Sequence, residues 1–445
     1  MTVKPGTLAA YVAPCLPIAA VGLPIVVYLP PYYAGTLGLD LATVGFLFFI
    51  VRVVDVPLDP IIGHFVDRTS TRLGRFRPWL IAGATVMVAG LYLVFMAQPG
   101  ITPLRAFAGL LLMYVGYSAS LVSHTSWGAV LTDDYHERSR IFGTWQAMNI
   151  LGLFLILGVP PLALFLAGAE DPALGVHAMG WVIIIALPLA VLLAVSTVPE
   201  RARVGEGHHR ISDIFGLLKL PLLRQLLAAD LLAALAPGLT GALFLFFFEA
   251  ARGYPPAEAS ALLLFYFAAG LLAAPLWVRF ARRRGKHRAL IWALILYMIF
   301  QTAILLMPAG NFLLAAFGMA LAGAPAVAPA FLMRAMLADV SDLETLRTGE
   351  ERTGLFYAAL VAVQKLGYAI PVGLSYQILG LIGFVPKLGA QNAPSAIVGL
   401  QWLFIVPPVV LACLALLVIR KWPIDAASQE ETAAALERRA AAARG

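Results

Sequence analysis

Long apolar stretches follow one another from one end of the chain to the other. Each is long enough to cross the roughly 30 Å of hydrocarbon in a bilayer as an α-helix. Backbone hydrogen bonds in lipid must be satisfied internally, so the stretches predict helices rather than loops or open sheets. The sequence therefore predicts an all-α polytopic membrane protein with twelve transmembrane helices. They are expected near residues 9–34, 41–66, 77–98, 103–132, 140–168, 176–198, 221–252, 256–283, 287–308, 310–338, 353–385 and 394–420.

The longest polar interruption, residues 199–221, falls between the sixth and seventh spans and predicts a linker between two halves. We expect an N-terminal half over 1–198, the cytoplasmic linker over 199–221, a C-terminal half over 222–422 and a cytoplasmic tail over 423–445. A weak repeat supports the halves, because the fourth and tenth spans both run into mixed acidic and basic residues. The tail is rich in Ala, Glu and Arg, which favours a short surface helix.

Lys and Arg gather in the loops after even-numbered spans, whereas the other loops hold only Arg105, Arg252 and Lys387. By the positive-inside rule both termini are cytoplasmic, in the plasma (inner) membrane. The basic residues behind the net charge of +7 are thus distributed as membrane topology requires, and they do not indicate nucleic-acid binding. The expected partners are a small-molecule solute and the lipid bilayer, with no obligate protein partner. Cys15 and Cys413 lie in predicted spans and indicate no disulfide.

Two carboxylates interrupt the second span. Arg52, Asp55 and Asp59 are spaced three and four residues apart, so they share one helix face. Each Asp at a span centre costs about 2.5–3.5 kcal/mol by insertion scales, which makes a pair improbable unless a cation occupies it. Oxygen ligands of this kind suit Na⁺ or Li⁺, or a proton shared between like charges. Pro57 and Pro60 leave helix carbonyls available as further ligands. The alternative is a structural network in which Arg52 neutralises one Asp.

The segment after the second span resembles a known family. Gly63-x-x-x-Asp67-Arg68 followed by Gly74-Arg75 resembles the loop signature of the major facilitator superfamily. The longer pattern from Asp59 to Trp79 resembles its glycoside-pentoside-hexuronide:cation symporter branch, the melibiose-carrier family. Residues 339–352 and 364–367 resemble that family's tenth loop and its span-eleven lysine motif. The resemblance implies the major facilitator fold, two pseudo-symmetric six-helix bundles.

By this resemblance Asp55 and Asp59 are the cation ligands, with a hydroxyl from the fourth span. Ser120 is the aligned residue, and Ser118 and Ser123 are alternatives. The site would bind a monovalent cation only, and the coupling ion would be Na⁺ or H⁺, or else Li⁺. No cofactor is expected. Lys365 would lie near both the cation and the solute; a lone Lys deep in a span faces a cavity or a carboxylate unless it snorkels to the interface.

Charged residues in the two signature loops are interpreted as a cytoplasmic gate whose ion pairs break when the inner side opens. The alternative for each is a solvated loop residue. The gate residues are Asp67, Arg68, Arg72, Arg75, Asp339, Asp342 and Arg352.

The sequence departs from melibiose-type carriers in the charged sugar ligands. Those carriers use Asp, Asp and Arg where this chain has Ala19, Ser123 and Met148. A less polar or amphiphilic solute, such as a lysophospholipid, therefore stays an alternative to a sugar. The remaining candidates for solute contact are Trp127, which matches the family's sugar-stacking tryptophan, together with His124, Lys365, Tyr28 and Asn149. A packed aromatic, or a neutral His bonded within the bundle, is an equally good interpretation of several of these.

The function that these features favour is cation-coupled secondary active symport of a small organic solute, glycoside-type by resemblance, by alternating access. An enzyme is not expected, because the seven His are scattered and no span holds a metal-spaced cluster. A non-coupled channel or a membrane-embedded sensor on the same fold is the alternative from another class.

Overall fold

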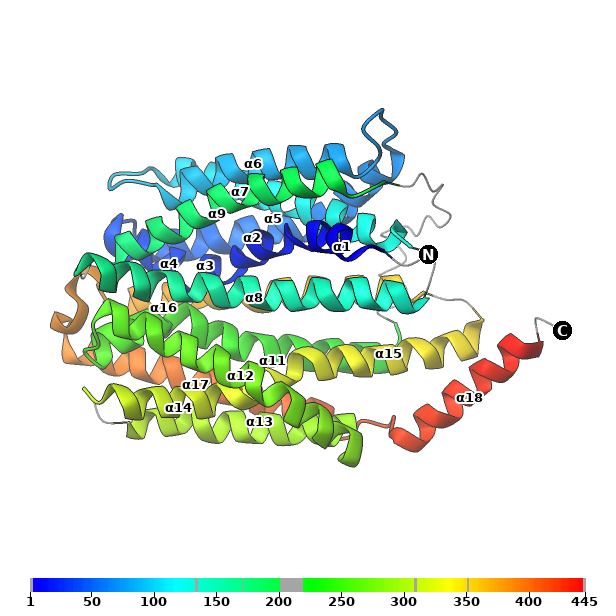
Figure 1. Cartoon of the computed structure of the whole chain (residues 1–445). Helices are drawn as coiled ribbons and strands as arrows, with labels where there is room; N and C mark the ends of the chain where they lie inside the picture. Colours follow the sequence, from blue (N-terminus) through cyan, green and yellow to red (C-terminus); the bar gives the residue numbers. More distant parts are fainter. Residues whose placement is uncertain are drawn as a thin grey trace. The chain divides into compact units, whose positions relative to one another are not determined.

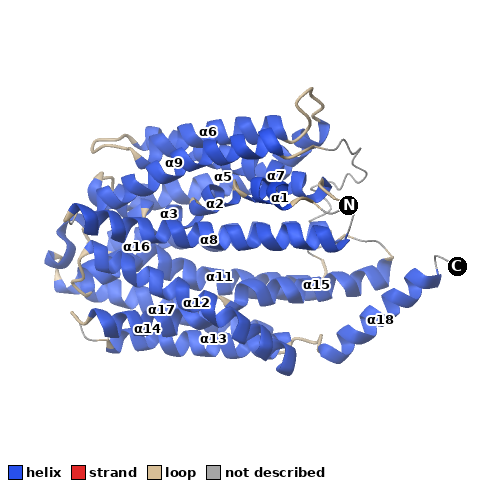
Figure 2. Cartoon of the chain, viewed as in Figure 1, coloured by secondary structure: helices blue, strands red, loops and turns tan. Residues whose placement is uncertain are grey.

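The computed structural model describes residues 3–132, 135–169, 171–200, 219–307, 310–349 and 352–442. Within these ranges almost every residue outside the connecting loops is helical (Figure 2). Twelve helical segments are long and apolar enough to cross a membrane, from Pro5–Val27 to Pro394–Ile419. The all-α, twelve-span prediction is confirmed.

The first six spans run in chain order from blue to green in Figure 1. Their elements are α1 (Pro5–Val12), α2 (Cys15–Ala20), α3 (Gly22–Val27), α4 (Leu29–Pro31), the π-helical turn η1 (Tyr32–Thr36), α5 (Leu41–Arg68), α6 (Arg77–Phe95), α7 (Pro103–Val130), α8 (Tyr135–Ala167) and α9 (Pro172–Thr197).

The last six spans and the tail follow. Their elements are α11 (Pro221–Phe246), the π-helical turn η2 (Phe247–Ala251), α12 (Pro256–Arg284), α13 (Lys286–Ala303), η3 (Ile304–Leu306), α14 (Phe312–Ala326), α15 (Ala328–Thr348), α16 (Thr353–Leu381), the 3₁₀ segment η4 (Pro386–Gln391), α17 (Pro394–Ile419) and α18 (Ala426–Ala442).

Proline divides the first span into short pieces. Pro14 precedes α2, and Pro24, Pro30 and Pro31 interrupt the hydrogen-bond ladder further along. Polar side chains cap the first turns of other helices, at the points where the chain passes from a loop into the next span. The Asp40 side chain accepts from Thr43 N at 3.0 Å at the start of α5, and Asp171 caps α9.

The described residues group by their mutual contacts into two compact units. Unit 1 holds residues 1–207 together with 242–264 and 372–400, and unit 2 holds 208–241, 265–371 and 401–445. These units differ from the predicted halves 1–198 and 222–422, because α11, α12, α16 and α17 each contribute one end to unit 1. Most of the predicted linker, residues 201–218, lies outside the described residues.

Glycines allow α6 and α7 to approach closely in unit 1. A Cβ on Gly90 would lie 2.3 Å from Met113 N, and one on Gly116 would lie 2.3 Å from Met87 N. Helices in lipid associate mainly through such backbone packing, since there is little hydrophobic gain between them. The crossing fixes the position of α7, which packs on α5.

The tail helix α18 packs on α15 in unit 2. Gln429 Nε2 donates to Asp342 Oδ2 at 3.1 Å, and Arg439 Nη1 donates to Leu346 O at 3.2 Å. The predicted tail helix is therefore present, and it covers one face of the helix that carries two of the proposed gate residues.

Candidate functional site

Asp55 is fully buried where α5 packs on α7. Its two carboxylate oxygens have different partners. Arg52 Nη1 lies 3.4 Å from Asp55 Oδ2, and Ser118 Oγ donates to Asp55 Oδ1 at 2.9 Å. A buried carboxylate with a cation on one side and a hydroxyl on the other is held in a fixed orientation.

Arg52 is positioned by an aromatic ring as well as by charge. Its guanidinium carbon lies 5.0 Å from the centroid of the Tyr114 ring on α7, a cation–π distance. Asp59 lies one turn beyond Asp55 on α5, half-buried, and its charge also acts on Arg52. With all three groups ionised, the cluster carries one net negative charge. A cluster of this composition has the charge and the oxygen donors that attract a monovalent cation or a proton.

Pro57 and Pro60 lie inside α5 on either side of Asp59. Because proline has no N–H, the carbonyls of Val53 and Val56 lose their usual helical donors. They add oxygens to the carboxylates as candidate ligands. Within the described residues no group of three or more His, Cys, Asp and Glu could hold a metal ion. Carboxylate and carbonyl oxygens are the hard donors that a cation such as Na⁺ accepts.

The structure distinguishes the three candidate serines of α7. Ser118, held open as an alternative, is the one that donates to Asp55. Ser120 Oγ faces α6, since a Cβ on Gly83 would lie 2.8 Å from it, and it has no hydrogen-bond partner among the described residues. Ser123 donates to Ala119 O at 2.6 Å within its own helix. Ser118 and Ser120 are only two residues apart, and the sequence motif did not distinguish between them.

His124 ties three helices of unit 1 together. Its Nε2 lies 2.6 Å from Tyr11 O on α1, and Trp145 Nε1 on α8 donates to its Nδ1 at 3.4 Å. Tyr11 stacks on the imidazole at 4.6 Å and donates through its hydroxyl to His124 O at 3.0 Å. With only 1% of its surface exposed, His124 is placed as a packed, hydrogen-bonded residue. Tyr11 was not singled out from the sequence.

Trp127 is fully covered by protein. Tyr11 lies edge-on to its ring at 6.5 Å, the Arg77 guanidinium lies 5.8 Å from it, and its Nε1 donates to Pro199 O at 3.4 Å. Contact with a solute would require these neighbours to move. Gly128 next to it is constrained, since a Cβ there would lie 2.0 Å from the Tyr11 hydroxyl.

The other predicted solute residues lie on three further helical elements. Lys365 is buried on the unit 2 part of α16, and Asn149 is half-buried on α8, where it donates to Trp145 O at 2.8 Å. Tyr28 lines a cavity at the end of unit 1 where the first span finishes, which we call the distal end. Within unit 1 the described contacts join Asp55 to Ser118, with Asp59 one turn further along α5.

The basic loop after α5 is held by a residue missed in the sequence. Glu200 accepts from the backbone N–H groups of Arg75, of Phe76 at 2.9 Å and of Arg77 at 3.3 Å. These donors lie at the start of α6, where unpaired N–H groups and the helix dipole favour an anion. In the sequence, the only sign of this role is a Glu that follows the sixth span.

The predicted gate residues divide into paired and exposed ones. Lys286 Nζ, also missed in the sequence, lies 2.6 Å from Asp339 Oδ1 across α13 and α15. Asp342 accepts from Gln429 of the tail, and Arg75 Nε donates to Val66 O at 3.1 Å. Arg68 and Arg72 are exposed, and Arg352 is half-buried. The Asp67 side chain lies outside the described residues.

Comparison with known proteins settles the family. Residues 10–426 match the family described as MFS/sugar transport protein. The chain belongs to this family. Its crystal-structure neighbours include the nucleoside transporter NupG, with a TM-score of 0.70 at 14% identity over 94% of this chain and 100% of that one. The likeness shows the major facilitator fold, as the sequence predicted.

Curated relatives agree with the melibiose-carrier resemblance, which is confirmed. The chain is 25% identical to the uncharacterized symporter YnaJ of Bacillus subtilis, covering 93% of this chain and 90% of that one. It is 26% identical to the putative glycoside/cation symporter YagG of Escherichia coli, covering 85% and 83%. It is 23% identical to the sodium-dependent lysophosphatidylcholine symporter 1 of Xenopus tropicalis, covering 92% and 83%. The protein is an integral membrane transporter of the MFS/sugar family.

Proposed function

We propose that this transporter is a secondary active symporter that couples Na⁺ or H⁺ to the movement of a small, hydroxyl-rich organic solute of the glycoside type. The coupling cation binds at Asp55 and Asp59, with Ser118 orienting Asp55. Two bundles rock around a central site, so that the solute is reached from one side of the membrane at a time.

The observation that carries the proposal is the buried cluster of Arg52, Asp55 and Asp59. Two carboxylates beside one guanidinium are costly to bury inside a membrane span, and a bound cation lowers that cost. The Arg52 guanidinium competes with the cation for Asp55, since it lies 3.4 Å from Oδ2. We propose that Arg52 and the cation exchange on Asp55, which gives the cluster the two states that coupling requires.

The packing of unit 1 supports alternating access. At its distal end η4, from the second half of the sequence, packs against η1 from the first half and against η2. A Cβ on Gly35 would touch Pro386 Cβ at 3.7 Å, so the two halves of the sequence meet there in direct contact. We interpret this as the closed outer side of a carrier. The distribution of Lys and Arg favours cytoplasmic termini, and we propose the inner membrane as the location.

Thermal unfolding of the purified protein with a solute panel tests the proposal. The panel contains methyl galactoside, methyl glucoside, a glucuronide, a small organic acid and a lysophosphatidylcholine, each in Na⁺ and in choline at two pH values. A ligand raises the apparent stability by mass action. We expect a glycoside to stabilise the protein more in Na⁺ or at low pH, and Asp59→Asn to lose that dependence. Stabilisation independent of both ions would contradict coupling.

A lysophospholipid is the second candidate solute. One named relative carries lysophosphatidylcholine, and Ala19, Ser123 and Met148 place no charge where sugar-binding carriers have one. Stabilisation by the lysophosphatidylcholine alone would move the solute to this amphiphile and leave the cation site unchanged.

A further inference from the structure

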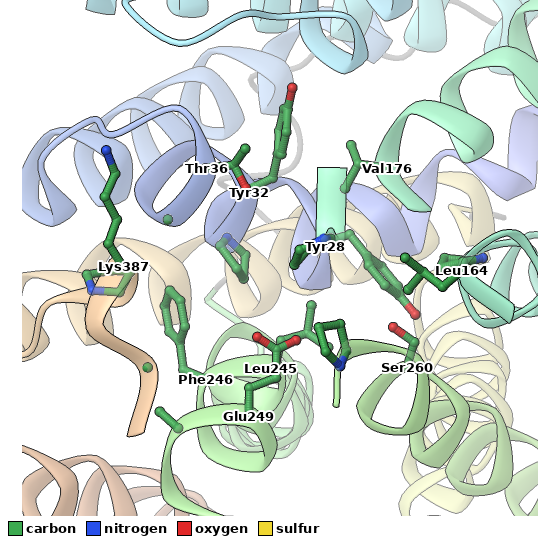
Figure 3. A pocket seen from close by; sticks show the side chains of 18 of the residues that line it. Tyr28, Tyr32, Thr36, Leu164, Val176, Leu245, Phe246, Glu249, Ser260 and Lys387 are labelled. Carbon is green, nitrogen blue, oxygen red and sulfur yellow. The ribbon is translucent and has the colours of Figure 1, made fainter. Parts of the chain in front are cut away.

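A cavity of about 310 Å³ lies at the distal end of unit 1, and Arg52, Asp55 and Asp59 are not among the residues that line it (Figure 3). Its walls come from the end of the first span, the facing ends of α8 and α9, the end of α11 with η2, the start of α12 and the η4 segment. The volume is at the lower end of the range found for small-molecule sites. A cavity of this volume can hold a small solute.

One carboxylate points into this cavity. Glu249 of η2 is half-buried, and among the described residues its side chain has neither an ion pair nor a hydrogen bond. Lys387 lines the same cavity but does not reach Glu249: its Nζ lies against the backbone of Gly38, where a Cβ would be 2.8 Å away. The cavity therefore has an available acceptor group and walls with no net formal charge.

Two hydroxyl groups lie on the wall beside the carboxylate. The Tyr28 hydroxyl is buried, has no hydrogen bond of good geometry among the described residues, and lies next to the hydroxyl of Ser260 (Figure 3). A buried hydroxyl that is poorly aligned with its neighbour gains free energy when a ligand or water pairs with it. These groups donate as well as accept, so they complement a ligand that itself carries hydroxyls.

Apolar ring surface completes the cavity. Phe246 and Tyr32 contribute aromatic side chains. The Tyr32 hydroxyl already donates to Ala97 O at 2.6 Å and lies 3.0 Å from His177 Nε2, so this residue offers its ring rather than its hydroxyl. A few converging polar groups among aromatic surface are typical of a site that binds a specific small solute.

We propose that the distal cavity is a second solute site, which binds a neutral pyranoside. Glu249 accepts hydrogen bonds from two ring hydroxyls, Tyr28 and Ser260 bond a third, and the ring faces lie on Phe246 and Tyr32. A simple organic cation fits less well, because it has no acceptor for the two hydroxyls and would share the cavity with Lys387. The inference rests on the proposed function for its solute class.

Occupancy of this site also favours one conformation. Tyr28 and Tyr32 belong to the first half of the sequence, whereas Glu249 and Ser260 belong to the second. Opening the distal end would separate these walls. A pyranoside that bridges them therefore stabilises the closed distal end, by its difference in affinity for the two states.

Photolabelling of the full-length protein tests the site. The probe is a galactoside with an alkyl diazirine on its aglycone, and methyl galactoside is the competitor. Mass spectrometry locates the label, and the half-protecting concentration of methyl galactoside is measured in wild type, Glu249→Gln, Tyr28→Phe and Glu258→Gln. Glu258 is the matched control, since it is exposed on α12 and does not line the cavity.

We expect label in peptides spanning residues 28–36 and 245–260. Glu249→Gln should raise the half-protecting concentration about tenfold or more, because charge-assisted hydrogen bonds are lost, while Glu258→Gln leaves it unchanged. Label confined to other peptides, equal protection in Glu249→Gln, or protection by choline but not by methyl galactoside would each overturn the proposal. Cation-driven uptake by wild type is measured in parallel. Uptake without distal labelling refutes this inference alone, and distal labelling without uptake refutes the proposed symport.

Discussion

Replacing Ser118 and Ser120 separately by Ala distinguishes two hydroxyls that lie two residues apart on α7. Ser118 Oγ is 2.9 Å from a fully buried Asp55 oxygen. A hydrogen bond to a charged acceptor contributes about 1.5–3 kcal/mol. Without it Asp55 loses the donor that orients Oδ1 away from Arg52, and Arg52 then competes better with the coupling ion. At 1.4 kcal/mol per factor of ten, Ser118→Ala should raise the half-saturating ion concentration about tenfold or more.

Ser120→Ala provides the matched control. Its Oγ lies against Gly83 with no hydrogen-bond partner among the described residues, so Ala removes a buried unsatisfied group at little cost. We expect its half-saturating ion concentration to stay within about twofold of wild type and its unfolding midpoint to stay unchanged or rise. The assay is solute-dependent thermal stabilisation titrated with Na⁺ at fixed pH, and with pH at zero Na⁺. Loss of ion affinity in Ser120→Ala but not in Ser118→Ala would refute the assignment of Ser118.

Three further changes test the packing around the site. Gly90→Ala should clearly lower the unfolding midpoint, because the new Cβ would lie 2.3 Å from a backbone nitrogen of α7. Gly143→Ala is the control and should leave the midpoint unchanged, because a Cβ there has nothing within 4 Å. Equal midpoints for the two variants would contradict the close crossing. Glu200→Gln should cost about 1–2 kcal/mol in a denaturation curve, because three N–H groups at the start of α6 lose a charged acceptor, and an unchanged curve would refute that role. Lys286→Asp and Asp339→Lys should each slow transport, because each breaks the 2.6 Å ion pair. If that pair supports transport, the double exchange should restore part of the rate. Additive losses in the double variant would argue against the pair.

The sequence predicted the fold because each span carries its own signal. Apolar length alone identifies a helix in lipid, so all twelve spans could be placed without any tertiary information. Asp55 and Asp59 were found for the same reason, since a charge in an apolar span is conspicuous and their spacing puts them on one helix face. The tail helix was likewise predicted from composition.

What the sequence could not predict depends on rotation and contact between helices. Which serine of α7 faces Asp55 depends on how α6 and α7 cross, and that is set by Gly83, Gly90 and Gly116, which have no charge or pattern to reveal it. Trp127 was predicted from a motif, but its exposure depends on Tyr11, which comes from a different span. Long-range partners of this kind leave no local signal.

Side chains near span ends were missed because they look like ordinary loop residues. Glu200, Lys286 and Glu249 each lie at a helix boundary, where charged residues are common and need no explanation. Only the structure shows that Glu200 caps α6, that Lys286 pairs with Asp339, and that Glu249 faces a cavity.

Accumulation of labelled solute in proteoliposomes tests the central claim most directly. An inward gradient of Na⁺ or of H⁺ is imposed on vesicles that hold wild type, Asp55→Asn, Asp59→Asn or the control Glu258→Gln, with equal solute on both sides. Both Asn variants keep side-chain volume and remove one charge from the cluster. The account predicts that wild type and Glu258→Gln concentrate the solute under one of the two gradients, and that both Asn variants only equilibrate it. Concentration of solute by both Asn variants, at the wild-type ratio, would contradict the assignment of Asp55 and Asp59 as the coupling site.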